Sequence, residues 1–149
     1  METHSEIAKK INTLVTKNND LNAKFLSFSI LAEGAVLQGI LRKHADMHRF
    51  FSLQLVHDLK TYVPDFNLEL NRTIANALEM GWEDIKASLG LENDKDLETQ
   101  LAKDHKASIV LYKELLLILP EEMPKLKSLL EAHLSWHYKA DEYLPEIDE

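Results

Sequence analysis

The sequence contains no cysteine, only 4 glycines and 4 prolines among its 149 residues, and no long apolar run. Without cysteine, disulfides, thiolate metal sites and cysteine nucleophiles are all excluded. The scarcity of glycine and proline favours a few long helices over many short strands. The longest apolar stretch, 109–119, is interrupted by Tyr112, Lys113 and Glu114 and is too short to span a bilayer. We therefore expect no membrane partner.

Basic residues are also in the minority: the sequence has 17 Lys and Arg and 25 Asp and Glu, which gives a net charge of −8. No basic stripe is available to neutralise phosphates, so we expect no nucleic-acid partner. Residues 1–10 lack the apolar run of a signal peptide, and a cytoplasmic protein is the expectation. The length suits a single domain, 1–149, with a hydrophobic core of its own.

Apolar residues recur at helical spacing over most of the chain. We predict four long helices at about 5–32, 35–62, 94–119 and 121–143, and a shorter one at about 71–89. Gly34 separates the first two, and Pro64 ends the second, since the residue before proline avoids the helical region. Pro120 ends the third long helix and, with Glu121 and Glu122, opens the fourth.

Two long helices, a crossover and two further long helices follow the order of ferritin-like proteins. We therefore predict an all-α fold, a ferritin-like four-helix bundle with an extra short helix in the crossover between the second and third long helices.

Five of the 7 histidines interrupt the apolar faces of these predicted helices. They are His44 and His48 in the second long helix, His105 in the third, and His133 and His137 in the fourth. Most lie near the middle of their helix, as Asn18 does in the first. A midpoint stays at mid-height whichever way a helix runs, so we expect these polar residues to share one layer of the core. His57 is predicted to face outward, and His4 lies at the terminus.

Two histidine pairs, His44 with His48 and His133 with His137, have the i,i+4 spacing that places both imidazoles on one helix face. Two such rings can bind one metal ion, and neutral imidazole suits zinc, copper, iron and nickel. Asp141, four residues past His137, could hold the second ring nitrogen of that ligand. We predict one histidine-rich transition-metal site formed by the five histidines, with zinc favoured because an all-nitrogen ligand set suits it.

The same histidines also allow a structure without metal. Neutral imidazoles can bond to one another, to Asn18, Asn22 and Tyr112, and to buried water. The protein would then be a non-enzymatic structural or interaction module that unfolds cooperatively in acid at about pH 5–6, as buried histidines become charged. A haem held by two histidines has no attachment motif in its favour. No residue pattern specifies a reaction or a substrate.

Several apolar residues fall on the flanks or rear of the predicted helices rather than on their inner faces. They are Phe50, Leu53, Val110 and Leu117. Such residues would be exposed in a monomer, so we expect a homodimer.

Residues 81–87, with the sequence Gly-Trp-Glu-Asp-Ile-Lys-Ala, followed by Ala107, Tyr112 and His137, resemble an uncharacterised family of small bacterial ferritin-like four-helix-bundle proteins. The similarity covers about 73–144. In the first half, only Leu14, Asp20, Phe25, Phe51 and Leu55 look similar. The resemblance implies a cytoplasmic, stress-associated protein with no established reaction.

Ferritin-like di-iron proteins use glutamates from two helices and a Glu-x-x-His motif from each of the other two. This sequence contains no Glu-x-x-His motif, and His105 stands where the resembled family tends to have a glutamate. A carboxylate-bridged iron pair is therefore disfavoured, and iron is a weaker expectation than zinc.

Overall fold

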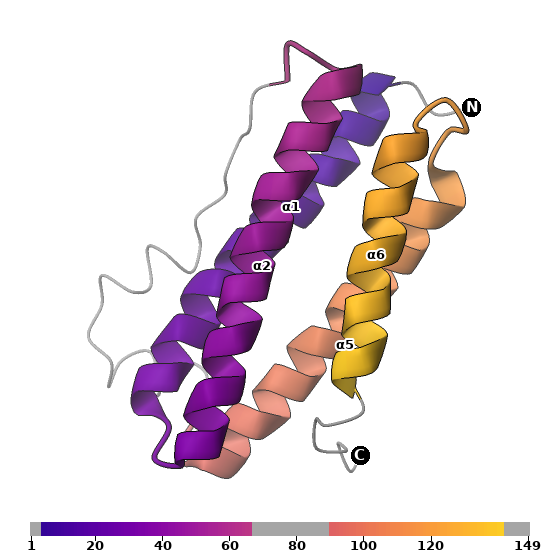
Figure 1. Ribbon diagram of the computed structural model, residues 1–149. Coiled ribbons are helices and arrows are strands. Elements are labelled where there is room, and N and C mark those ends of the chain that lie inside the picture. Colours follow the sequence, from indigo (N-terminus) through magenta and orange to yellow (C-terminus); the bar gives the residue numbers. More distant parts are fainter. Residues whose placement is uncertain (1–3, 67–89, 142–149) are drawn as a thin grey trace.

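The computed structural model describes residues 4–66 and 90–141, and these residues form four α-helices. The helices are α1 (His4–Leu31), α2 (Ala35–Tyr62), α5 (Asp94–Ile118) and α6 (Pro124–Asp141) (Figure 1). The described residues contain no strand, which confirms the all-α prediction. The helix predicted at 71–89, most of the motif that carries the family resemblance, and the predicted end of the last helix at 143 all lie outside the described residues.

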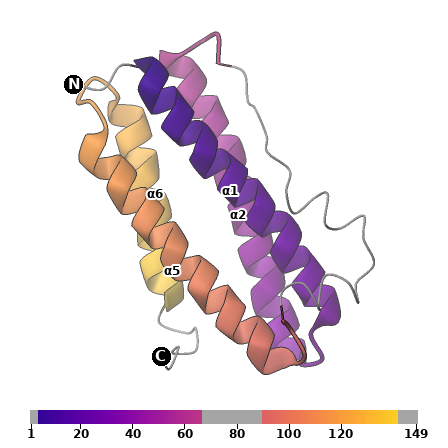
Figure 2. The same ribbon diagram turned by 180° about the vertical axis from the view of Figure 1, so that it is seen from behind.

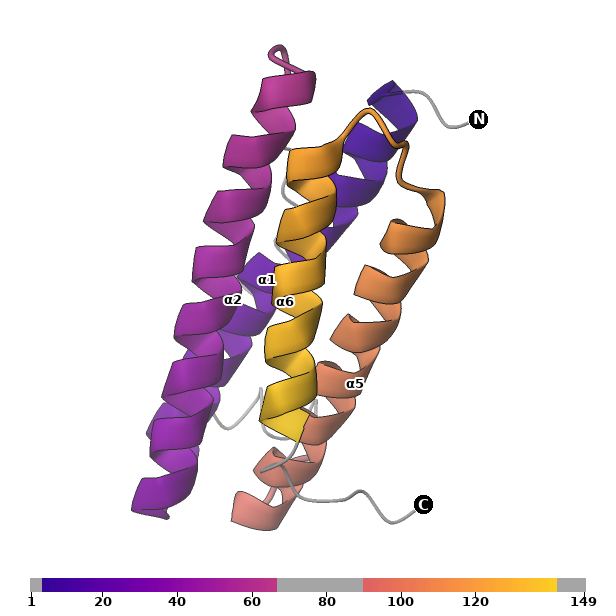
Figure 3. The ribbon, with the colours of Figure 1, turned by 45° about the vertical axis from the view of Figure 1, so that its right-hand side comes forward.

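The four helices pack as two antiparallel hairpins. Helices α1 and α2 lie side by side along their whole length, as Figures 1 and 2 show from opposite sides, and they make the most extensive contact in the bundle. Figure 3 shows α6 beside α5 and also beside α2, so the second hairpin packs across the first. Helices α2 and α5 run in the same direction (Figure 1). None of the described helices is both long and apolar enough to cross a membrane.

The start of α5 is fixed by two side chains. Asn93 is the N-cap, and its side-chain oxygen accepts a hydrogen bond from the backbone N–H of Asp96 at 3.1 Å. The carboxylate of Asp94 accepts hydrogen bonds from the backbone N–H groups of Glu33 and Gly34, both at 2.9 Å. Asp94 thereby attaches the turn between α1 and α2 to the first residue of α5.

The start of α6 differs from the prediction. Helix α6 begins at Pro124 rather than near residue 121, and Pro120 to Met123 form a turn that closes with a bond from the Met123 N–H to the Pro120 carbonyl at 3.2 Å. Pro124 disfavours the helical conformation for the residue before it, while proline itself suits the first helical position. The second proline of the segment, rather than the first, therefore starts the helix.

The apolar core is divided into two clusters. One contains residues from the N-terminal half of α1, the end of α2, the end of α5 and the start of α6, including Ile11, Leu59, Leu115 and Leu126. The other contains residues from the end of α1, the start of α2 and the start of α5, including Phe28, Leu41 and Leu101. On α1, α2 and α5, the buried residues Asn18, His48 and His105 lie in sequence between the two clusters.

Candidate metal centre

The five histidines predicted to face inward are all buried. His44, His48, His105, His133 and His137 expose at most 2% of their surface, while His4 and His57 are exposed. Helical periodicity explains this placement, because each of the five lies on the same helix face as the buried leucines on either side of it.

Four of the five rings form a continuous row. The ring centroids of His44 and His105 are 5.5 Å apart, those of His105 and His137 are 4.8 Å apart, and those of His137 and His48 are 5.5 Å apart. His133 does not join this row, because its ring stacks on Phe51 at 3.8 Å. The expected single layer therefore contains four histidines, and His133 is joined to it only through other side chains.

One set of hydrogen bonds passes through all four described helices and returns to the helix where it began. His48 on α2 bonds through Nδ1 to Asn18 Oδ1 on α1 at 2.6 Å, and Asn18 Nδ2 donates to the Tyr112 hydroxyl on α5 at 3.3 Å. That hydroxyl contacts His133 Nδ1 on α6 at 3.0 Å, and His133 Nε2 contacts Gln54 Oε1 on α2 at 2.8 Å. We call these five residues the hydrogen-bond circuit.

The circuit determines which ring nitrogen of His48 carries the hydrogen. The Asn18 amide nitrogen donates to Tyr112, so the amide oxygen is the atom that accepts from His48. The hydrogen of a neutral His48 ring is therefore on Nδ1, and Nε2 carries a bare lone pair. At the other end of the circuit, Tyr112 donates to His133 Nδ1, and His133 Nε2 donates to the Gln54 side-chain oxygen. Both nitrogens of His133 are therefore occupied.

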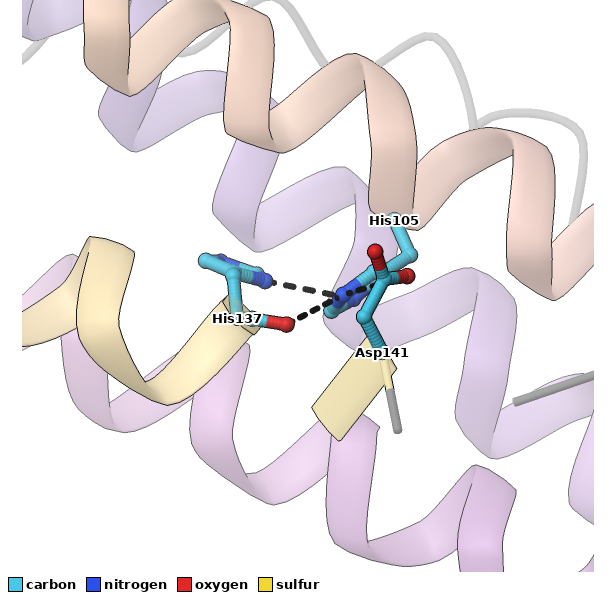
Figure 4. A network of polar contacts seen from close by, with 3 residues as sticks. All are labelled: His105, His137 and Asp141. Carbon is cyan, nitrogen blue, oxygen red and sulfur yellow. Dashed lines mark hydrogen bonds and ion pairs between the residues drawn. The ribbon is translucent and has the colours of Figure 1, made fainter. Parts of the chain in front are cut away.

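A second set of contacts, shown in Figure 4, determines the form of His137. His105 Nε2 donates to the backbone carbonyl of His137 at 2.7 Å and lies 3.5 Å from Asp141 Oδ1. A neutral His105 ring must then accept through Nδ1, which lies 3.2 Å from His137 Nδ1. His137 therefore carries its hydrogen on Nδ1, and its Nε2 is bare. The expectation that Asp141 would hold His137 is wrong, because Asp141 reaches across to His105 instead.

Four buried ring nitrogens have no hydrogen-bond partner among the described residues. They are Nδ1 and Nε2 of His44, Nε2 of His48 and Nε2 of His137. An unpaired buried polar atom costs free energy, so each of these nitrogens lacks a partner: an acceptor for the N–H of a neutral His44, and a donor or an ion for the other three.

All five rings are neutral at pH 7. Burial lowers the pKa of His44 and of His133 from 6.5 to about 3. It lowers the pKa of His137 to about 2, and that of His48 well below 6.5. Burial also lowers the pKa of His105, against the opposing effects of the His137 carbonyl and of Asp141. A neutral imidazole keeps one lone pair, which is the form that binds metals.

The surroundings of the two bare nitrogens are aromatic. The His48 ring lies 5.6 Å from the Phe25 ring, and the His137 ring lies 5.4 Å from Tyr112 and 5.1 Å from Trp136. Two further polar residues bond to other groups: Asp104 pairs with Lys24 at 2.7 Å, and Asn22, an expected partner of the histidines, donates to the Ala45 carbonyl at 2.8 Å.

The arrangement limits which metal geometries are available. Within residues 4–66 and 90–141, no three His, Asp or Glu side chains are placed so that they could hold one ion together. Sequence reasoning missed Gln54 and Trp136 as neighbours of the site. Gln54 lies three residues after Phe51, and only the position of α6 against α2 reveals its contact with His133.

Comparisons of the chain with family models, with curated proteins and with solved structures gave no match. The family resemblance therefore remains a sequence-based expectation.

Proposed function

We propose that the protein is a metal-binding helical bundle that holds one transition-metal ion between α2 and α6, through Nε2 of His48 and Nε2 of His137. The observation that carries this proposal is the pair of bare, buried Nε2 atoms on neighbouring rings. Two imidazoles that share an ion at bond lengths of about 2.0–2.1 Å have ring centroids about 5–6 Å apart. The 5.5 Å between the rings of His48 and His137 falls in that range.

The hydrogen bonds on the far side of each ring support the same assignment. Ligating histidines usually donate their other N–H to a neighbouring acceptor, which fixes the orientation of the ring. His48 donates to Asn18, and His137 donates to His105. His105 and His133 use both nitrogens in hydrogen bonds, whereas His44 makes no hydrogen bond among the described residues that would orient its ring. The proposal therefore narrows the five predicted ligands to two.

The bundle itself we propose to be ferritin-like. Parallel α2 and α5 fit a bundle with one long crossover, which is the ferritin-like arrangement. The ligand set argues against carrying over ferritin chemistry, because the two candidate ligands are imidazoles and the sequence lacks a Glu-x-x-His motif.

Elemental analysis of protein purified without chelator tests the proposal. We expect close to one metal ion per chain in the wild type, and loss of that ion in the double variant His48→Leu with His137→Leu. The variant His57→Leu, which changes an exposed histidine on the same helix as His48, should retain the metal. A wild-type protein that is folded and takes up no ion after metal addition would overturn the proposal.

A second candidate function is favoured by the circuit itself. The circuit joins α2, α1, α5 and α6, so the polar layer can serve only to hold the four helices together. Buried water would then bond to the bare nitrogens. The protein would then be a structural or interaction module. Calorimetry with and without a chelator distinguishes the two functions. The chelator should lower the melting temperature of a bundle that binds a metal and leave the melting temperature of a metal-free bundle unchanged.

A further inference from the structure

We infer that the ion between His48 and His137 is monovalent copper, Cu(I), rather than a divalent ion such as zinc. The inference rests on the proposed function and names the class of ion. Three observations support it: the number of available donors, the absence of compensating charge at the two rings, and the aromatic surroundings.

The number of donors suits Cu(I). Zinc takes four ligands in proteins, and even its open catalytic sites use three from the chain. In the part of the chain that the structure describes, no three candidate side chains converge on one point. Cu(I), with a filled d shell and a single charge, can be held by as few as two imidazole nitrogens. His48 and His137 offer two such nitrogens, on rings from α2 and α6 whose centroids are 5.5 Å apart.

The charge balance of the site points the same way. Both ligands are neutral, and the neighbouring carboxylates are engaged elsewhere, Asp104 by Lys24 and Asp141 by His105. An ion bound here would keep its full charge in a buried, low-dielectric environment. The cost of burying an ion grows with the square of its charge, so a divalent ion is penalised about four times as heavily as a monovalent one. Two neutral ligands therefore discriminate against zinc.

The aromatic rings around the ligands add an attraction for a cation. The rings of Trp136 and Tyr112 lie close to that of His137, and the ring of Phe25 lies close to that of His48. Aromatic faces attract cations, and the attraction increases where water is excluded. It acts on a weakly hydrated monovalent ion without any need for a third ligand. The zinc expectation assumed several histidines around one ion, and no three candidate ligands among the described residues are placed to hold an ion together.

Competition titrations of the full-length, chelator-treated protein test the inference. Cu(I) is added anaerobically in the presence of bicinchoninate, Ag(I) serves as a redox-inert monovalent probe, and Zn(II) is titrated in parallel against a chromophoric chelator. We expect one equivalent of Cu(I) and of Ag(I) to bind, with Zn(II) binding at least about 100-fold more weakly than Cu(I).

Variants and nitrogen NMR locate the ion. His48→Leu and His137→Leu should each abolish Cu(I) binding while the circular dichroism spectrum stays helical, and His57→Leu should bind as the wild type does. If a leucine variant fails to fold, the imidazole ¹⁵N resonances of the wild type decide instead, because Ag(I) should shift the Nε2 signals of two histidines.

Each contrary result has a distinct meaning. Zinc binding as tight as Cu(I) binding, lost in the same two variants, would overturn the preference for a monovalent ion and leave the proposed metal site standing. Failure of all three ions to bind the folded protein would overturn the proposed function and the inference with it. Cu(I) binding that survives both leucine changes would refute the assignment of the two ligands.

Discussion

At the scale of single residues, His48 and His133 show how the position of one hydrogen decides what a buried imidazole can do. Both rings are buried, neutral and bonded through Nδ1, yet His48 accepts nothing at Nε2 while His133 donates from Nε2 to Gln54. The difference arises from their neighbours. Asn18 presents an oxygen to His48, whereas Tyr112 presents a hydroxyl hydrogen to His133. The first arrangement leaves a lone pair free, and the second does not.

The Tyr112 hydroxyl is the residue-scale feature most open to test. Burial raises the pKa of this hydroxyl above its usual 10.0, so it stays protonated and joins Asn18 to His133. Tyr112→Phe removes one oxygen and leaves Asn18 Nδ2 and His133 Nδ1 without the hydrogen-bond partner they share. We expect the free energy of unfolding, measured with urea, to fall by about 1–3 kcal/mol.

Tyr138→Phe is the matched control, because Tyr138 is a half-exposed tyrosine on α6. It should change the free energy of unfolding by no more than about 0.5 kcal/mol. Equal stability of the two phenylalanine variants would contradict the role assigned to the circuit.

The sequence was sufficient to identify which histidines are buried, and insufficient to identify their bonds. Helical periodicity places His44, His48 and Asn18 on inner faces because burial depends on spacing within one helix. Which nitrogen meets which oxygen depends on how two helices are rotated and shifted against each other. That is why Asp141 was assigned to His137, on its own helix, when it lies nearer to His105 on the neighbouring one.

At the scale of helices, the sequence predicted a helix boundary correctly wherever a single capping or helix-breaking residue marked it. Gly34 and Pro64 limit α2, and Asn93 caps α5, as expected. The predicted start of α6 was wrong because Pro120 and Pro124, four positions apart, are both suitable residues for the first turn of a helix. The Met123 side chain is fully buried, so the turn from Pro120 to Met123 also has an apolar contact to maintain.

The buried ion pair between Lys24 of α1 and Asp104 of α5 gives an element-scale prediction. Its atoms are 2.7 Å apart, and both side chains are 10% exposed. Lys24→Met leaves a buried carboxylate without its partner, and we expect a loss of about 3–5 kcal/mol in urea unfolding. Adding Asp104→Leu removes the stranded charge, so the double variant should recover most of that loss.

Lys9→Met changes an exposed lysine on the same helix and should leave stability nearly unchanged. A double variant as unstable as Lys24→Met alone would show that the two side chains do not act as a pair.

At the scale of the whole molecule, the buried histidines make stability depend on pH. The pKa values of His44 and His133 are about 3 in the folded protein, against 6.5 for an ordinary histidine. At pH values between about 3 and 6.5, these two histidines bind a proton in the unfolded chain and remain neutral in the folded one. Stability is therefore complete above pH 6.5 and falls as the pH drops towards 3, by about 1.4 kcal/mol per pH unit for each histidine.

Urea unfolding of the chelator-treated protein at several values between about pH 5 and pH 8 measures this slope. His133→Leu should reduce the slope by the share of one histidine, and His57→Leu should leave it unchanged. A wild-type slope of zero below neutral pH would contradict the neutral state assigned to these rings.

The outer surface of the bundle gives a second prediction at this scale. Phe50, Leu53, Val110 and Leu117 are each more than half exposed, as expected from their places on the predicted helices. The homodimer remains a prediction, which requires that these side chains together form an apolar patch large enough for an interface.

Sedimentation equilibrium should give twice the mass of one chain, and Phe50→Glu with Leu53→Glu should reduce it to one. Glu131→Gln, at an exposed polar position on α6, should keep the wild-type mass. A wild-type protein that sediments as a monomer would refute the prediction.

The direction of the hydrogen-bond circuit is set by the orientation of two amides, those of Asn18 and Gln54. If the amides of Gln54 and Asn18 both flipped, every donor would become an acceptor, and His48 would receive a bond at Nδ1 and carry its hydrogen on Nε2. That Nε2 could no longer bind an ion. If the proposed site exists, rotation of these two neutral amides would therefore remove one of its two ligands, with no change in charge and none in the backbone.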